Sequence, residues 1–295
     1  MDYRIPEWFS PKRYELFIDV TPNHFTGSVV IDLEVNQPTK EIPIHAVSPL
    51  RILSAEIVSP VRSELSLESF AYEMTLLKAN QELQNRLVVK ILFVSKYLSD
   101  GRGCYVTYFP DSKMISTHFA PTFARMAFPC MDEPSKKSVF KLTVSCEIGY
   151  EVVSNSQLYN LQTQGHNQVY EFCESPLMPT YLVHWSVFKP NSRSKNGIVS
   201  AYSYSPACEG FVDLAANALE YFSEYLNFEY PLPKLDLISV ACMSVSAMEN
   251  WGCICFHSSV MENSRNTRVS YMVLLHELAH NWFGNLVTME WVRVT

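Results

Sequence analysis

The sequence lacks any long block of lysine or arginine, and its formal net charge is −7 over 295 residues. Proteins that track a phosphate backbone need clustered positive charge, so nucleic acid is not an expected partner. No run of about 18 apolar residues occurs, and the chain does not begin with the basic and apolar segments of a secretory signal. Asn-x-Ser/Thr glycosylation sites are also absent. We therefore expect no membrane segment and a cytoplasmic protein.

A disulfide framework is also missing. The chain has eight cysteines, but they are widely spread and no Cys-x-x-Cys pair occurs. We expect reduced, buried thiols. What the chain does have is 47% hydrophobic residues and only 18% charged ones, which predicts a globular protein with a sizeable core and enough length for two domains.

The first two thirds of the chain show hydrophobic alternation with a period of two, the pattern of half-buried strands. β-Branched and aromatic residues dominate these segments, and turn residues separate them. The predicted strands are residues 14–20, 27–35, 41–45, 87–93, 140–146, 168–173 and 180–188. The sequence therefore predicts an N-terminal all-β saddle or sandwich domain over residues 1–190.

A polar stretch at residues 189–197, rich in serine, lysine and asparagine, has the composition of a linker or hairpin and marks the predicted domain boundary. Beyond it, apolar residues recur with a helical period from Phe211 to Leu226, before two prolines. Another helical pattern runs from Thr267, a candidate N-cap, to Gly284, a candidate stop. Residues 191–295 are therefore predicted to form a second domain with α-helical structure.

The last of these helices contains the pattern His-Glu-x-x-His at residues 276–280. Residues four apart lie on one helix face, so His276 and His280 can bind one metal ion while the neighbouring Glu277 reaches a water molecule on that ion. Zinc accepts two imidazole ligands plus a carboxylate and keeps a position for water, whose proton Glu277 could take. The alternative is a chance match with two core histidines, which the helical context makes rare.

A second motif precedes this helix: Ser246-Ala247-Met248-Glu249-Asn250-Trp251-Gly252, read as an edge strand and turn after a strand at residues 237–240. Together with the zinc motif, it resembles the Gly-Ala-Met-Glu-Asn signature of the aminopeptidase N and puromycin-sensitive aminopeptidase family. Residues 121–134 and 281–288 resemble further motifs of that family, so the resemblance covers nearly the whole chain.

The resemblance implies a multidomain β then α+β protein, in which the β-domain is followed by the start of a thermolysin-like catalytic domain. It implies a zinc-dependent aminopeptidase that removes N-terminal residues from peptides with a free N-terminus, using one zinc ion. Glu249 would bind the cationic α-amino group, because an exopeptidase must recognise that charge. Ser246, Ala247, Met248 and Asn250 would lie along the substrate backbone. An ordinary surface carboxylate is the alternative for Glu249.

Several departures from the family pattern bear on activity. Ser246 stands where the family usually has glycine, and His118 and Ala120 stand where it commonly has glutamine and an acidic residue. His118 could be a third metal ligand or a hydrogen-bonded histidine of the cleft. The family's glutamate zinc ligand, its transition-state tyrosine and its helical domain would all lie beyond Thr295, so we expect this chain to hold zinc weakly and to be inactive alone.

Two other functions remain open from the sequence. A non-catalytic chain could bind peptides or a full-length family member through its β-domain. A zinc endopeptidase shares the same helix motif, but the amine-binding signature around Glu249 disfavours that alternative. For residues 129–134 we expect a structural turn and domain contact, and for Trp251 and Trp282 packing positions.

Overall fold

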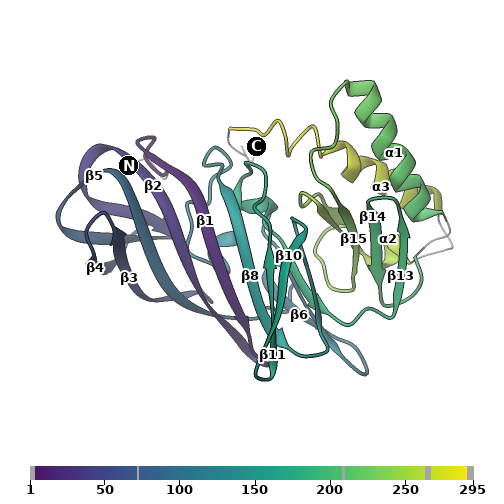
Figure 1. Ribbon diagram of the computed structural model, residues 1–295, viewed down its shortest axis with the longest axis horizontal. Helices are drawn as coiled ribbons and strands as arrows, with labels where there is room; N and C mark the ends of the chain where they lie inside the picture. The colour runs from purple at the N-terminus through teal and green to yellow at the C-terminus, as the bar shows by residue number, and fades with distance from the viewer. Residues whose placement is uncertain (1–3, 72, 208–209, 263–266, 291–295) are drawn as a thin grey trace.

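The computed structural model of the chain describes residues 4–71, 73–207, 210–262 and 267–290. A β region made of two sheets comes first and is followed by a smaller α+β region built on a third sheet (Figure 1). This order confirms the predicted fold class.

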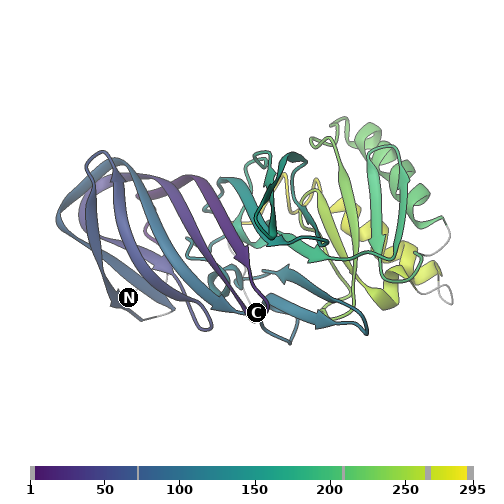
Figure 2. The same ribbon diagram turned by 60° about the horizontal axis from the view of Figure 1, so that its bottom comes forward.

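The larger sheet of the β region has eight strands in the order β10-β11-β8-β1-β2-β5-β3-β4. All neighbouring pairs are antiparallel except β1 and β8. Figure 2 shows its long strands lying side by side in a strongly curved layer. The strands are β1 (Phe9–Val20), β2 (His24–His45), β3 (Arg51–Ser59), β4 (Ser63–Ser69), β5 (Met74–Lys96), β8 (Val139–Glu147), β10 (Leu158–Gln164) and β11 (Asn167–Phe172).

The strands predicted at residues 27–35 and 41–45 are parts of one strand, β2. Its pairing with β5 is irregular between Val35 and Glu41, where the polar residues between the two hydrophobic segments are mostly exposed. The hydrophobic alternation of the sequence is interrupted at this irregularity, and for this reason the sequence predicted two strands where the structure has one.

A four-stranded sheet completes the β region, in the order β6-β7-β12-β9. Its strands are β6 (Gly103–Tyr108), β7 (Lys113–His118), β9 (Glu151–Ser154) and β12 (Trp185–Phe188). The prediction of a strand over residues 180–188 is wrong in its first half, because Thr180–Leu182 forms a 3₁₀ turn, η2. The buried Thr180 hydroxyl donates to Asp132 at 2.6 Å, and this contact holds the turn against residues 129–134. Another 3₁₀ turn, η1, spans Ala124–Met126.

The third sheet has the order β13-β14-β15-β17-β16. Its strands are β13 (Ser192–Asn196), β14 (Val199–Ser203), β15 (Leu235–Val240), β16 (Ala247–Met248) and β17 (Cys253–His257). The polar stretch at residues 189–197 thus supplies the first strand of a hairpin, as one of its two interpretations predicted. The central pairs β14–β15 and β15–β17 are parallel. Strand β16 is an outer strand of the sheet and lies within residues 246–252, the motif that was predicted to form an edge strand and turn.

In the described part of this region, three helices accompany the sheet: α1 (Phe211–Leu226), α2 (Ser258–Met261) and α3 (Thr267–Ala279). Helix α1 has the bounds that its apolar period predicted, and it connects the parallel strands β14 and β15 as a βαβ unit. Figure 1 shows α1 and α3 on the side of the third sheet that faces away from the eight-stranded sheet. Helix α3 ends at Ala279, five residues before the predicted stop at Gly284.

The third sheet is buried on both faces, as its parallel central strands require. Along β15, Leu237 packs against the helices, whereas Ile238 joins the core of the β region. Along β17, Phe256 faces the helices and Cys255 faces the β region. The alternation of side chains along each strand therefore places one sheet between two hydrophobic cores.

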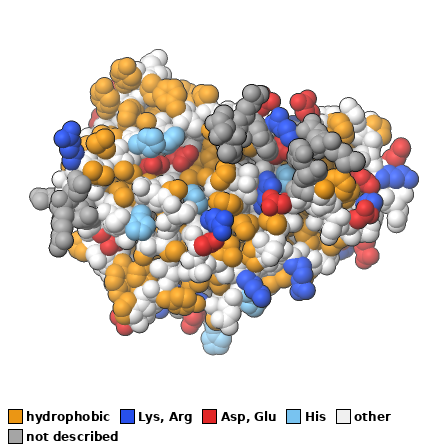
Figure 3. All heavy atoms as spheres, turned by 180° about the vertical axis from the view of Figure 1, so that it is seen from behind, with side chains coloured by type: hydrophobic (Ala, Val, Ile, Leu, Met, Phe, Trp, Pro, Cys, Tyr) orange, Lys and Arg blue, Asp and Glu red, His pale blue; other side chains and the backbone are white. Residues whose placement is uncertain are grey.

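Surface and thiol features agree with the composition. Within the described ranges, no helix combines the length and apolar character needed to cross a membrane. The seven cysteines in those ranges are free thiols, as expected. On the face shown in Figure 3, lysine and arginine side chains stand singly among acidic and hydrophobic ones, without a continuous basic surface.

Candidate metal centre

Helix α3 brings the two predicted zinc ligands together. His276 and His280 are one turn apart, and their Nε2 atoms lie 3.1 Å from each other. Two imidazoles that bind one tetrahedral zinc ion at about 2.0–2.1 Å would have nitrogens separated by about 3.3 Å. The spacing of the two nitrogens therefore fits a shared ion.

A backbone contact orients the second histidine. The Nδ1 atom of His280 lies 2.8 Å from the carbonyl oxygen of Phe283. A carbonyl only accepts, so Nδ1 carries the proton and donates it, and Nε2 keeps its lone pair for a metal. Gly284 leaves room for this ring, because a Cβ atom there would lie 3.0 Å from Nδ1 of His280.

Glu277 lies on the inner side of α3 and is 6% exposed. Burial, and secondly the nearby Glu249 carboxylate, raise the pKa of Glu277 to about 8. A cation bound between the two carboxylates would reverse this effect, because it favours the charged form of both groups.

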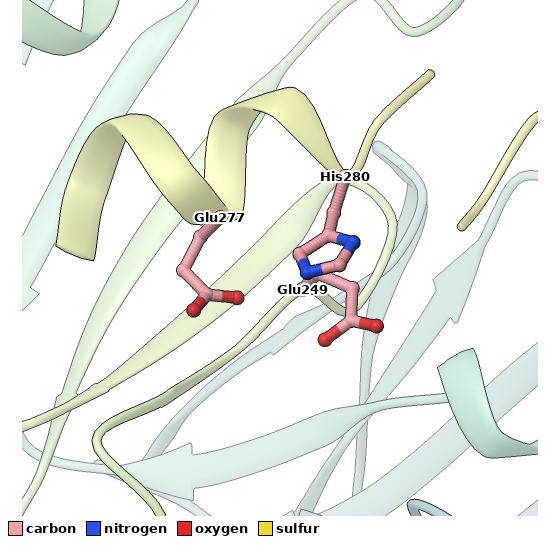
Figure 4. Close-up of side chains that lie close together, drawn as sticks. All are labelled: Glu249, Glu277 and His280. Atoms are coloured by element: carbon pink, nitrogen blue, oxygen red, sulfur yellow. The ribbon is translucent and has the colours of Figure 1, made fainter. Parts of the chain in front are cut away.

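Glu249 approaches Glu277 and His280 from the turn that follows β16. Ligand atoms of these three residues all lie within 4.8 Å of one another, and this is the only grouping of three or more potential metal ligands within the described ranges. Figure 4 shows both carboxylates and the imidazole facing one common space. Donor types and spacing suit zinc, which binds imidazole nitrogen and carboxylate oxygen.

The other residues of the second motif divide into two groups. Ser246 is exposed and Ala247 half-buried, whereas the side chains of Met248 and Asn250 are buried. Asn250 turns inward, with its Nδ2 atom 3.4 Å from Nδ1 of the fully buried His184. Met248 and Asn250 can therefore meet a substrate only through their backbone.

His118 stands apart from this grouping. It is 4% exposed, its Nδ1 atom has no hydrogen-bond partner, and burial lowers its pKa to about 4. It does not belong to the metal-ligand grouping found within the described ranges. His118 is thus buried outside the grouping, and its Nδ1 atom lacks the hydrogen bond that the second interpretation expects.

The two tryptophans pack as expected, whereas the hydrogen bonds of residues 129–134 lie within the β region, so the domain contact expected for them stays a prediction. Trp251 is buried in the core shared with the β region, and Trp282 packs below α1, donating its indole proton to the carbonyl of Phe228 at 3.0 Å. Asp132 accepts from the guanidinium of Arg125 at 3.0 Å, a buried ion pair between turns of the β region.

Sequence reasoning missed several residues that hold the site in place. Asn285 donates to the carbonyl of Glu249 at 2.9 Å, and Lys137 donates to the carbonyl of Asn285 at 3.2 Å. Asn155 of the β region donates its amide proton to the carbonyl of Trp251 at 2.8 Å. Asn285 lies within residues 281–288, which resemble a family motif directly after the zinc helix, so this motif could have indicated that Asn285 supports the site. Asn155 and Lys137 stand in segments with no local pattern, and only the tertiary fold shows their role.

A mixed sheet, a His-Glu-x-x-His helix and a facing glutamate are together typical of zinc metallopeptidases. Residues 10–182 match the peptidase M1 N-terminal domain and residues 211–293 match the peptidase family M1 domain. The chain therefore belongs to peptidase family M1, a family of zinc metallopeptidases.

Named relatives are aminopeptidases. The chain is 31% identical to a puromycin-sensitive aminopeptidase of Caenorhabditis elegans over 98% of its own length and 33% of the relative's. It is 32% identical to endoplasmic reticulum aminopeptidase 1 of Rattus norvegicus over 98% of the chain and 34% of that protein. It is 31% identical to a probable aminopeptidase 1 of Sulfurisphaera tokodaii over 95% of the chain and 36% of that protein. The chain thus spans about a third of the length of these relatives.

Proposed function

We propose that this chain carries the zinc-binding, proton-accepting and amine-binding residues of a zinc-dependent aminopeptidase. In this proposal His276 and His280 bind the zinc ion, Glu277 is the general base, and Glu249 binds the free α-amino group of a peptide. The observation that carries the proposal is the grouping of the Glu249 and Glu277 carboxylates with His280 within 4.8 Å. One carboxylate next to the metal suffices for hydrolysis, and the second matches a substrate that brings its own positive charge.

The peptide would lie along the outer strand β16. The free edge of a sheet can add an extended peptide through backbone hydrogen bonds. Ser246 and Ala247 are accessible at this edge, and Met248 and Asn250 contribute their backbone groups. Glu249 follows at the end of the strand, so the peptide would present its amino terminus there.

A residue can then be assigned to each step of the proposed reaction. When bound, zinc lowers the pKa of a water molecule and polarises the peptide carbonyl. Glu277 accepts the proton of that water and returns it to the leaving amine, while Glu249 holds the α-ammonium group through a charge-assisted hydrogen bond. His280 keeps its lone pair available because Phe283 holds the proton on the opposite ring nitrogen.

We also propose two domains, residues 1–190 and 191–295. The third sheet begins at Ser192, which supports a boundary near residue 190. A cytoplasmic location is part of the proposal and is supported by the free thiols of the seven described cysteines, since disulfides form readily in secretory compartments.

Zinc content and hydrolysis of aminoacyl amides test the function. Two proteins are compared: the 295-residue chain, and a fusion that continues residue 290 with the remaining part of the C. elegans aminopeptidase. We expect both to bind zinc, the 295-residue chain more weakly than the fusion, and only the fusion to hydrolyse leucinamide; neither should hydrolyse N-acetyl-leucinamide. A fusion that is folded and zinc-loaded but cleaves neither substrate, or both equally, contradicts the proposal.

The chain without added segments tests a second candidate, a non-catalytic binder of free-amine peptides. It is favoured by the ligand grouping itself: both carboxylates have other roles in the proposed reaction, which leaves His280 and the neighbouring His276 as the zinc ligands in the described part of the chain. Zinc-dependent binding of a free-amine peptide without hydrolysis would support it.

Replacement of Glu249 by glutamine should weaken substrate recognition without removing the metal. The lost charge-assisted contact corresponds to about 1.5–3 kcal/mol, a decrease of about 10–100-fold in kcat/KM for leucinamide in the fusion. The exposed Glu229 provides a control, since Glu229→Gln removes a carboxylate outside the grouping and should leave kcat/KM unchanged. An unchanged rate for Glu249→Gln would exclude Glu249 from amine binding.

A further inference from the structure

The segment after α3 is fixed to the zinc helix by its own backbone. The amides of Asn285, Leu286 and Val287 donate to the carbonyls of the residues five positions earlier, His280, Asn281 and Trp282, at 3.0, 3.2 and 3.1 Å. The helix first tightens after Ala279, where the amides of Asn281 and Trp282 donate to the residues three positions earlier, and the run of i to i−5 bonds then follows. The turn therefore keeps a fixed position relative to His280.

The side chain of Asn285 connects this turn to Glu249. Its side chain is fully buried, and its Nδ2 atom donates to the backbone carbonyl of Glu249 at 2.9 Å. The two residues are 36 positions apart in the sequence. A single side-chain amide thus joins the main chain of the proposed amine-binding residue to the helix that carries the proposed zinc ligands.

The β region supports the same turn from behind. The Nζ atom of Lys137 donates to the carbonyls of Asn285 and Leu286, both at 3.2 Å, and the Tyr181 hydroxyl donates to the carbonyl of Gly284 at 3.2 Å. These contacts leave the turn little freedom to move away from Glu249.

We propose that Asn285 is a positioning residue that sets the spacing between Glu249 and the zinc ligands, and that Lys137 holds it in place. This inference rests on the proposed function. In any amino acid the amine nitrogen and the carbonyl carbon are about 2.5 Å apart. A carboxylate that binds the amine must therefore sit at a fixed short distance from the metal that activates the carbonyl. A displacement of about 1 Å is a large fraction of that spacing and can cost about 100-fold in rate.

The spacing has a direct consequence for selectivity. A ligand that occupies the metal and the amine site at once gains from Glu249 only when the two sites are at the correct separation. A ligand that occupies the metal alone gains nothing from the spacing. Loss of Asn285 should therefore reduce the preference for a free amine without changing binding at the metal.

L-Leucine hydroxamate and its N-acetyl form provide the two probes, because both carry a metal-chelating hydroxamate and only the first has an ammonium group. Their dissociation constants are measured by calorimetry on the zinc-loaded 295-residue chain, together with zinc content. We expect Asn285→Ala to lower the free-amine preference by about 10-fold, as for loss of a charge-assisted contact, with unchanged zinc content and unchanged N-acetyl binding. The matched control is Asn281→Ala, since Asn281 is equally buried in the same turn but donates to Leu278 of its own helix.

Two adjacent lysines provide a second test that does not disturb the core. Lys137→Met removes the contacts to Asn285 and Leu286, whereas Lys136→Met removes equivalent contacts to the carbonyls of Pro6 and Phe9. We expect a several-fold loss of free-amine preference for Lys137→Met and none for Lys136→Met. The two lysine variants test the positioning role of Asn285 even if Asn285→Ala does not fold.

The outcomes separate the two proposals. If the unsubstituted chain shows no free-amine preference, or keeps it after Glu249→Gln, the proposed function fails. If Glu249→Gln removes the preference but Asn285→Ala and Lys137→Met keep it, the positioning inference alone is overturned. A variant that loses zinc and both ligands together would show a purely structural role and would also overturn it.

Discussion

Glutamine in place of Glu277 is expected to reduce turnover by about 10²–10⁴-fold, the usual contribution of a positioned general base. The substitution keeps the size and shape of the side chain but removes its ability to take a proton from water. Because Glu277 is not one of the two proposed imidazole ligands, zinc should remain bound. Single-turnover hydrolysis of leucinamide by the fusion, with zinc content measured on the same samples, gives both quantities.

His280→Ala is the informative comparison for this experiment. It removes a proposed ligand whose Nε2 atom lies 3.1 Å from that of His276, so zinc itself should be lost. Retained activity in Glu277→Gln would show that another base operates. Loss of zinc in Glu277→Gln would instead show that this carboxylate binds the metal, which would reassign its role.

In the proposed reaction, the two carboxylates would each meet a positive charge. Without a cation, Glu277 is held partly protonated near neutral pH by burial and by Glu249. A zinc ion next to His280 and an α-ammonium group next to Glu249 would each favour the ionised form of the nearest carboxylate. Each cation would therefore compensate the negative charge of the carboxylate nearest to it.

Local patterns in the sequence predicted the elements on which the site depends. The apolar period from Phe211 to Leu226 matched α1, and the spacing of His276 and His280 placed both rings on one helix face. These predictions were reliable because they depend on residues three or four positions apart, whose geometry the helix alone fixes.

Contacts between distant segments could not be predicted in the same way. No pattern around Lys137 or Asn155 indicates that these residues of the β region reach the turns beside Glu249. The nearly continuous apolar residues of β17 are typical of a strand buried on both faces, but they do not show that one face shares a core with the β region. The proposed boundary near residue 190 coincides with a change of sheet, and the hydrophobic core continues across it.

The β region and the third sheet approach each other closely at the turn after Glu249. Gly252 has φ of +76°, and a Cβ atom there would lie 2.0 Å from the backbone oxygen of Asn155 and 2.9 Å from Cδ1 of Leu232. The Asn155 side chain meanwhile donates to the carbonyls of Trp251 and Leu182 at 2.8 and 2.7 Å. Only a glycine allows the β region to approach this closely.

Gly252→Ala is accordingly expected to destabilise the chain by about 4 kcal/mol or more. About 1–2 kcal/mol arises from the left-handed backbone and about 3 kcal/mol from overpacking against a backbone atom that cannot turn aside. Gly165→Ala is the control, because Gly165 also has a positive φ, +63°, but its Cβ would meet nothing within 4 Å. That control should lose only about 1–2 kcal/mol.

Urea denaturation of both variants, followed by tryptophan fluorescence, measures the difference. The chain has five tryptophans, including Trp251 next to the substituted residue, so their summed emission reports on unfolding of both regions. Equal destabilisation in the two variants would mean that Asn155 moves away at little cost. A much larger loss for Gly252→Ala would show that the proposed amine-binding turn is held by close packing of the β region against it, and that folding of the site depends on both regions together.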